Sequence, residues 1–140
     1  MISTLDALRL AVDTGVLTLI WIVQLVIYPS LCRYAESDLK IWHPDYTRRV
    51  TYIVLPLMLS QLVLAIFSSI RLGGILYLFH LILVIVAWII TFVKAVPLHQ
   101  QLDLSVSGLS IAKQLTEVNV SRTIVWTLAW LITILAAFFD

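Results

Sequence analysis

Four stretches without a charged residue organise this chain, and each is long enough to cross a membrane. They are 17 to 22 residues long and cover residues 14–32, 50–70, 72–93 and 123–139. A helix needs about 20 apolar residues to span a bilayer core, where backbone polar groups must be satisfied within the helix itself. We therefore expect a single all-α integral membrane domain over residues 1–140, an antiparallel four-helix bundle with spans near 8–31, 50–70, 73–95 and 122–139.

Proline and glycine positions refine this prediction. Gly73 and Gly74 favour a tight turn, which makes the second and third spans antiparallel neighbours. Pro44 suits the first turn of the second helix. Pro56 lies within that helix, where it removes a backbone donor and predicts a kink.

A short amphipathic helix is expected before the fourth span. Its two faces differ in polarity, with Ile111, Leu115 and Val118 on one side and Lys113 and Glu117 on the other. Such a helix either lies on the membrane surface or continues directly into the fourth span.

Composition excludes several classes of function. With 140 residues, 61% of them hydrophobic, the chain has no room for an additional soluble domain. Nine scattered basic residues and a net charge of +1 do not predict nucleic-acid binding. The single cysteine, Cys32, rules out an internal disulfide and the thiol pair of a dithiol redox enzyme.

Basic residues predict the orientation in a plasma (inner) membrane. Seven of them flank the first and third connections: Arg33, Lys40, Arg48, Arg49, Lys94, Lys113 and Arg122. Only Arg9 and Arg71 are expected on the opposite face, so the positive-inside rule places both connections in the cytoplasm and both termini outside. Acidic residues flank the first span where a cleavable signal peptide would be basic, so we expect that span to be retained.

Polar residues within the spans are candidates for function because each needs a partner in the bundle interior. One face of the first span is expected to collect Asp13, Leu17, Trp21, Gln24 and Tyr28. By depth, Asp13 can meet His80 of the third span, and Gln61 lies near the middle of the second. The Asp13–His80 pair is a proton-relay or ligand site, or a polar contact that fixes helix packing. As a further alternative, Asp13 reaches the outer water.

A second group of candidates lies at the cytoplasmic ends of the spans. Aromatic rings, histidines and a cation together are typical of a pocket for an anionic or quinone-like aromatic ligand. We expect His99 to be its acid–base group and Arg122 its anion partner. The expected ligand-binding residues are Gln24, Tyr28, His43, Gln61, Asn119 and Trp126. An interface with anionic lipids has a similar composition and remains the alternative.

Metal and haem sites are not predicted. Two histidines at matching depth in the spans would be needed for haem, and only His80 lies inside one. Cys32, His43, His99 and Asp103 are suitable metal ligands, but their spacing matches no characteristic site. No particular cofactor is indicated.

Several motifs resemble those of a family of small bacterial four-span membrane proteins of unknown function. They are Trp21-Ile-Val-Gln24 with Tyr28-Pro29, Pro56-Leu-Met-Leu59, Val96-Pro97-Leu98-His99, and Asn119 with Arg122-Thr123 and Trp126. This resemblance implies the fold and not an activity. A weaker similarity, in the turn after the third span and the arginine at the start of the fourth, is to the anthrone oxygenase-like membrane proteins. It implies oxidation of aromatic polyketides without a bound metal.

Two hypotheses for function follow. In the first, the protein binds a hydrophobic aromatic or quinone-like molecule in a cytoplasm-facing pocket, and oxidation of that molecule is left open. In the second, it is a non-enzymatic accessory subunit that packs on a larger membrane complex. The expected partners are the lipid bilayer, a hydrophobic small molecule, and a membrane-protein partner or further copies of the chain.

Overall fold

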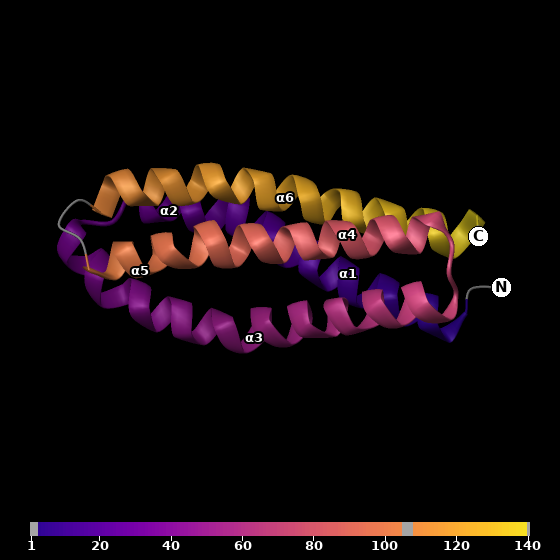
Figure 1. The fold of residues 1–140 in the computed structure, drawn as a ribbon. Helices are drawn as coiled ribbons and strands as arrows, with labels where there is room; N and C mark the ends of the chain where they lie inside the picture. Colours follow the sequence, from indigo (N-terminus) through magenta and orange to yellow (C-terminus); the bar gives the residue numbers. More distant parts are fainter. Residues whose placement is uncertain (1–2, 105–107, 140) are drawn as a thin grey trace.

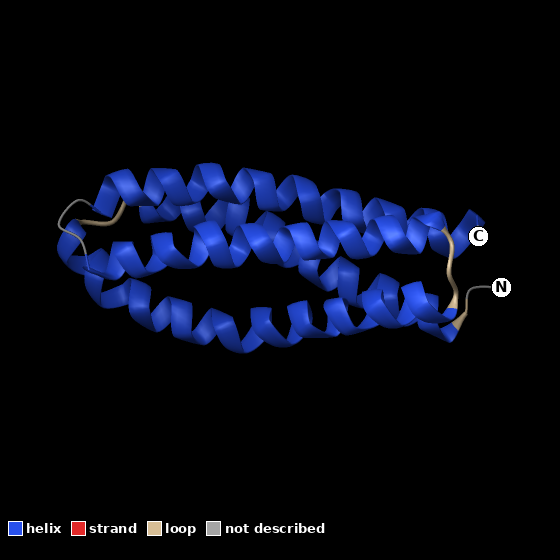
Figure 2. Cartoon of the chain, in the orientation of Figure 1, coloured by secondary structure: helices blue, strands red, loops and turns tan. Residues whose placement is uncertain are grey.

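The computed structural model describes residues 3–104 and 108–139, and nearly all of them are helical. Four helical units in this part of the chain are long and apolar enough to cross a membrane. They run alternately up and down and are joined by short connections (Figures 1 and 2). The predicted all-α four-helix bundle is therefore confirmed.

The helical elements extend beyond the spans expected from hydropathy. In chain order they are α1 (Thr4–Ile22), η1 (Val23–Ile27), α2 (Tyr28–Leu31), α3 (Glu36–Arg71), α4 (Ile75–Ile90), η2 (Thr91–Ala95), α5 (Val96–Leu104) and α6 (Gly108–Phe139). The expected amphipathic segment is the first part of α6 and is continuous with the fourth span. Its residues Ile111 and Leu115 are buried against the bundle. Residues 105–107 of the third connection lie outside the described residues.

The two ends of the bundle differ in how the chain turns. At one end, called the loop end here, α2 is followed by α3 and α5 by α6. At the other, called the terminal end, α3 turns into α4, and the beginning of α1 and the end of α6 lie nearby (Figure 1). The α3–α4 turn uses Gly73 and Gly74, both with positive φ. This is the tight turn that the two glycines predicted.

Helix α3 contains both of its prolines in its interior. The helix begins at Glu36, so the expectation that Pro44 occupies a first turn was wrong. Each proline lacks a backbone N–H and frees one carbonyl of the preceding turn. Figure 1 shows α3 curved, bowing away from α4 along its middle. Pro44 lies in the loop-end part of α3, and Pro56 lies near the middle of the helix.

Two wide helical turns interrupt the first and third helical units. In η1 the Tyr28 N–H bonds to the Val23 carbonyl, and in η2 the Val96 N–H bonds to the Thr91 carbonyl, each five residues back. Pro29 and Pro97 follow directly. A proline ring clashes with the carbonyl four residues earlier in an α-helix, and a π-turn relieves this clash. The prolines thus account for both wide turns.

The π-turn in the first unit changes which residues face the interior. Buried positions follow at steps of three and four: Asp6, Arg9, Asp13, Val16, Ile20 and Val23, and then Tyr28 after a step of five. The expected face through Leu17 and Trp21 was wrong, since Trp21 is 41% exposed. The prediction assumed a constant helical period from Asp13 to Tyr28. The extra residue of the π-turn instead rotates Tyr28 onto the face of Asp13, while Trp21 stays on the outside.

Small residues allow the helices to approach closely. Ala65, Ala87, Ala112, Ala129 and Ala136 are almost completely buried. In a lipid environment, packing of small residues is a main source of helix association because lipid tails are as apolar as leucine. Large apolar side chains lie instead on the outer surfaces of all four helical units, where lipid covers them.

Replacing Gly74 by alanine should destabilise the bundle. Gly74 has φ 87° and ψ 157°, a region open almost only to glycine, and a Cβ there costs about 1–3 kcal/mol. The melting temperature of the detergent-solubilised protein, followed by circular dichroism, should fall.

Leu72→Ala is the matched control for this turn, because Leu72 is about half exposed and has an ordinary φ of −97°. It should change the melting temperature much less than Gly74→Ala. Equal effects of the two substitutions would contradict the assignment of backbone strain to Gly74.

Candidate functional site

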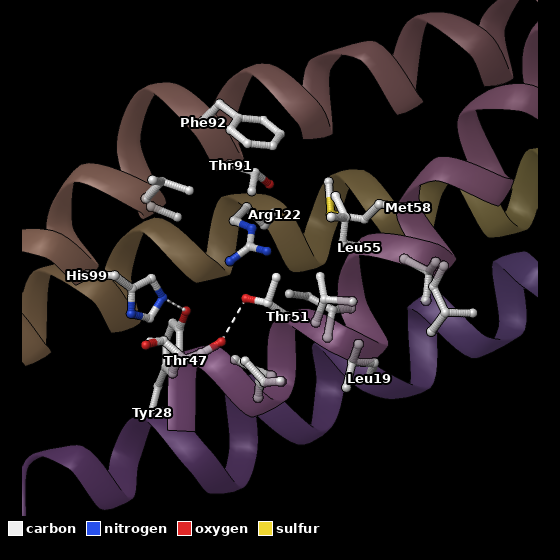
Figure 3. A pocket seen from close by; sticks show the side chains of 18 of the residues that line it. Leu19, Tyr28, Thr47, Thr51, Leu55, Met58, Thr91, Phe92, His99 and Arg122 are labelled. Atoms are coloured by element: carbon white, nitrogen blue, oxygen red, sulfur yellow. Dashed lines mark hydrogen bonds between the residues drawn. The ribbon is translucent and has the colours of Figure 1, made fainter. Parts of the chain in front are cut away.

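A cavity of about 390 Å³ lies between the four helical units, toward the loop end. Its walls come from α1 to α2, the first half of α3, η2 with α5, and α6. The residues in Figure 3 that enclose it include Leu19, Tyr28, Thr47, Thr51, Leu55, Met58, Thr91, Phe92, His99 and Arg122. Helices from every part of the chain therefore contribute to this pocket.

The pocket is apolar toward the bundle middle and polar toward the loop end. Val16, Ile20 and Met58 line its inner part, and Tyr46 and Asp103 belong to its outer part. Leu55 and Phe92 also line it and are each more than 40% exposed on the outer surface of the bundle. An elongated amphiphilic molecule matches this gradient from apolar to polar walls.

A chain of hydrogen bonds runs along the polar end of the pocket. The Tyr28 hydroxyl lies 2.8 Å from His99 Nε2, and His99 Nδ1 lies 2.9 Å from His43 Nε2. His43 Nδ1 in turn lies 2.6 Å from a carboxylate oxygen of Asp103. Side chains from α2, α3 and α5 are thus joined in one line.

Arg122 is held in place by neutral groups. One guanidinium nitrogen donates to Asn119 at 3.1 Å, and the Asn119 amide donates to Gln24 at 2.9 Å. The guanidinium also lies over the Trp126 ring, 5.0 Å from its centre. Figure 3 shows the guanidinium pointing into the pocket.

The charge of Arg122 is not balanced by a nearby carboxylate. Arg122 is 7% exposed, and no ion pair joins it to an acidic residue among those described. Its buried Nε has no hydrogen-bond partner there. A buried cation with an unused donor is costly, so the pocket presents an unsatisfied site for an anionic oxygen.

A second polar cluster lies between the four helical units, around Asp13. Gln61 donates to one carboxylate oxygen at 2.7 Å and Thr133 donates to the other. His80 Nε2 lies 3.0 Å from Asp13, at ion-pair distance but without the alignment of a hydrogen bond. The structure therefore places the expected Asp13–His80 pair together and joins all four helical units at this carboxylate.

Arg9 extends this cluster toward the terminal end. It is 1% exposed, lies 3.1 Å from Asp6 and over the Tyr77 ring, and its guanidinium approaches Thr133. Arg9 lies on the terminal side of the bundle, opposite the two long connections as expected, but its side chain is buried and presents no exposed charge there. The spacing of Asp6, Arg9 and Asp13 on one helical face was the available signal.

The residues predicted for the pocket fall into two groups. Tyr28, His99, Arg122 and Trp126 line the cavity, whereas His43, Gln24 and Asn119 lie behind its wall and hold the lining residues. Gln61 does not line the cavity. It accepts a hydrogen bond from the Trp126 indole at 3.0 Å and so links the cavity wall to the Asp13 cluster.

Two titratable residues of the cavity lining were not among the residues assigned to catalysis or ligand binding from the sequence. Tyr46 and Asp103 both line the cavity. Asp103 is four residues after His99, and Tyr46 is three after His43, so each shares a helical face with a predicted residue. That spacing was the signal in the sequence.

The arrangement of His43, His99 and Asp103 does not favour a metal ion. Their nitrogen and oxygen atoms face one another in pairs and do not converge on a common centre. Within residues 3–104 and 108–139, no group of three histidine, cysteine or acidic side chains is placed to hold a metal. Cys32 packs instead against an apolar cluster of α2, α3 and α6.

Gln61→Met should destabilise the bundle although it preserves side-chain size. It removes a donor to the Asp13 carboxylate and the acceptor of the Trp126 indole, and each buried polar group left unsatisfied costs about 1–3 kcal/mol. Thermal unfolding in detergent should occur at a clearly lower temperature. Gln114→Met, the same change at an exposed position of α6, should have little effect, and similar losses in both variants would argue against a role for these contacts.

Comparison with known proteins gives no relative from which to transfer a function. No protein-family model, no curated protein and no solved structure matches this chain.

Proposed function

We propose that this membrane protein binds a hydrophobic aromatic or quinone-like molecule with an acidic hydroxyl or anionic oxygen. The molecule occupies the cavity at the loop end, with its oxygen at Arg122 and its ring system toward the bundle middle. The observation that carries this proposal is the buried Arg122 guanidinium, which lines an apolar cavity without a carboxylate partner among the described residues.

The electrostatics of Arg122 favour an anionic or strongly polarised ligand group. A buried charge is stable only when it is paired and hydrogen-bonded. Asn119 and the Trp126 ring supply neutral contacts and no negative charge. A ligand oxygen at the guanidinium would supply both a hydrogen-bond acceptor and a countercharge, which is a charge-assisted contact of the stronger kind.

The size and lining of the cavity favour an aromatic ring system. Its volume of about 390 Å³ is within the range of small-molecule sites, which are commonly apolar with a few polar groups that orient the ligand. Trp126, Tyr28 and Tyr46 offer aromatic surfaces beside the apolar side chains. Rings that stack or pack edge-on against such surfaces gain more than from burial alone.

His99 and Arg122 have different roles at the ligand oxygen. The guanidinium stabilises negative charge there, and His99, joined to Tyr28, takes or returns the proton. If the bound molecule is also oxidised, as the similarity to anthrone oxygenase-like proteins implies, the same two groups would handle its hydroxyl proton.

Surface charges support a cytoplasmic location for the loop end and a plasma (inner) membrane location for the protein. Six of the seven basic residues assigned to that side are exposed: Arg33, Lys40, Arg48, Arg49, Lys94 and Lys113. Arg122 is buried in the cavity wall and does not contribute. The remaining excess of exposed lysine and arginine follows the positive-inside rule.

Arg122→Ala and His99→Ala should each weaken saturable binding strongly while leaving the bundle folded. A suitable probe is 2-hydroxy-1,4-naphthoquinone, an aromatic quinone with an acidic hydroxyl whose ionisation changes its visible absorption. Hydrogen bonds to charged groups contribute about 1.5–3 kcal/mol, so we expect at least about a tenfold loss of affinity. Equilibrium dialysis against the detergent-solubilised protein measures this.

Arg33→Ala is the matched control, because Arg33 is an exposed arginine at the same end of the bundle. It should leave the dissociation constant unchanged and correct for partition of the probe into micelles. Unaltered binding in both the His99 and Arg122 variants would overturn the proposal.

Native mass spectrometry of protein gently extracted from its own membrane tests the proposal without a chosen probe. A bound aromatic molecule would support it directly. A stoichiometric protein partner on an otherwise bare chain would favour the alternative function, an accessory subunit of a larger membrane complex.

A further inference from the structure

We propose that His43 and Asp103 form a proton relay that connects the cavity with water at the loop end. Through it, a bound molecule with an ionisable hydroxyl exchanges its proton with the aqueous phase while it stays in the cavity. This inference rests on the proposed function and assigns two further residues to the same site.

The relay is a continuous line of short contacts from a buried to an exposed group. Tyr28 is 2% exposed, and its hydroxyl lies 2.8 Å from His99. His43 is completely buried, between His99 at 2.9 Å and Asp103 at 2.6 Å. The Asp103 side chain is 30% exposed, so the last member of the line reaches water.

With Asp103 ionised and both imidazoles neutral, one order of donors and acceptors along this line follows. An ionised carboxylate only accepts, so His43 Nδ1–H donates to Asp103. A neutral imidazole has one donor and one acceptor nitrogen, so His43 Nε2 accepts from His99 Nδ1–H. By the same rule His99 Nε2 accepts from the Tyr28 hydroxyl. Every proton in the line therefore points from the cavity toward Asp103.

Proton transfer along this line is balanced at each atom. The ligand hydroxyl gives its proton to the Tyr28 oxygen, and the Tyr28 proton moves to His99 Nε2. The proton of His99 Nδ1 moves to His43 Nε2, and that of His43 Nδ1 moves to Asp103, which releases it to water. The ligand becomes an oxyanion beside Arg122. The reverse sequence carries a proton from water to the ligand.

The polar cluster around Asp13 is not connected to the cavity by groups that could pass on a proton. Its link to the cavity runs through the Gln61 amide and the Trp126 indole. An indole nitrogen only donates, and an amide does not exchange donor and acceptor roles as an imidazole does. Proton exchange is thus confined to the loop end and does not continue across the bundle.

Charged and titratable groups from each neighbouring element face the relay. Tyr28 comes from α2, Tyr46 from α3, where its ring lies 6.2 Å from that of His43, and Arg122 from α6. Arg122 is the cation among them, and it favours a ligand that has lost its proton.

The relay predicts a specific effect of Asp103→Asn. The amide can still accept the hydrogen bond from His43, but it cannot take up a proton. After a laser-induced pH jump, the absorbance of bound 2-hydroxy-1,4-naphthoquinone reports proton exchange per bound probe. Positioned acid–base groups contribute about 10²–10⁴-fold to proton transfer, so exchange should slow about 100-fold or more.

Asp45→Asn is the matched control. Asp45 is a carboxylate at the same end of the bundle, 41% exposed at its side chain and paired with Arg48 and Arg49. Exchange should proceed in this variant as in the unmodified protein. Exchange in Asp103→Asn at the rate of the Asp45 control would overturn the relay.

A measurement without ligand tests the order of donors independently. The chain has three histidines, so ¹⁵N-histidine NMR resolves each ring, with His43→Asn and His80→Asn for assignment. His43 and His99 should both carry their proton on Nδ1 at neutral pH. Asp103→Asn should preserve this state, and Asp103→Leu should mix the tautomers of His99, two hydrogen bonds away. A proton on Nε2 of either ring in the unmodified protein would overturn the relay.

The two proposals fail in different ways. If the unmodified protein shows no saturable binding of the probe, the proposed function is rejected for this ligand class and the NMR result alone decides the relay. If the probe binds and Asp103→Asn leaves its proton exchange unchanged, the relay is rejected and the binding function stands.

Discussion

The carboxylate of Asp13 is the point at which the four helical units are joined by polar contacts. Gln61 from α3, His80 from α4 and Thr133 from α6 all contact it. In a bilayer, packing apolar faces together gains little over contact with lipid tails, so small residues and polar contacts define how helices pair. A buried carboxyl group between apolar helices is tolerated because its partners come from every neighbouring unit.

The loop-end cavity differs from this cluster in what it leaves unsatisfied. The polar groups around Asp13 contact one another, and Gln61 also accepts a hydrogen bond from the Trp126 indole. Beside Trp126, the Arg122 guanidinium has neutral partners and a free Nε. Arg122 faces a cavity, whereas Asp13 faces other side chains. We therefore interpret the Asp13 cluster as a set of contacts that stabilises the fold, and the cavity at Arg122 as a ligand-binding site.

The two π-turns explain how the cavity and its polar end arise. Each inserts an extra residue before a proline, in η1 before Pro29 and in η2 before Pro97. The insertion rotates the following residues around the helix axis, which brings Tyr28 and His99 to the same place. Helix α3 bows away from α4 along its middle (Figure 1), and the cavity is lined by the part of α3 from Tyr46 to Met58 and by residues of η2. Wide turns of this kind are frequent at functional sites.

The sequence by itself determined the four apolar helices, their antiparallel order and the tight Gly73–Gly74 turn, because span length and glycine conformation are local properties. It also identified Tyr28, His99 and Arg122 as residues that belong near one another. Only the tertiary structure decided which faces point inward: Trp21 precedes the π-turn and is exposed, and the extra residue of that turn brings Tyr28 to the interior. It likewise decided that Arg9 is a buried partner and that Asp103 ends a line of hydrogen bonds. The physical reason is that helix formation depends on neighbours along the chain, whereas burial and hydrogen bonding depend on groups that other helices supply.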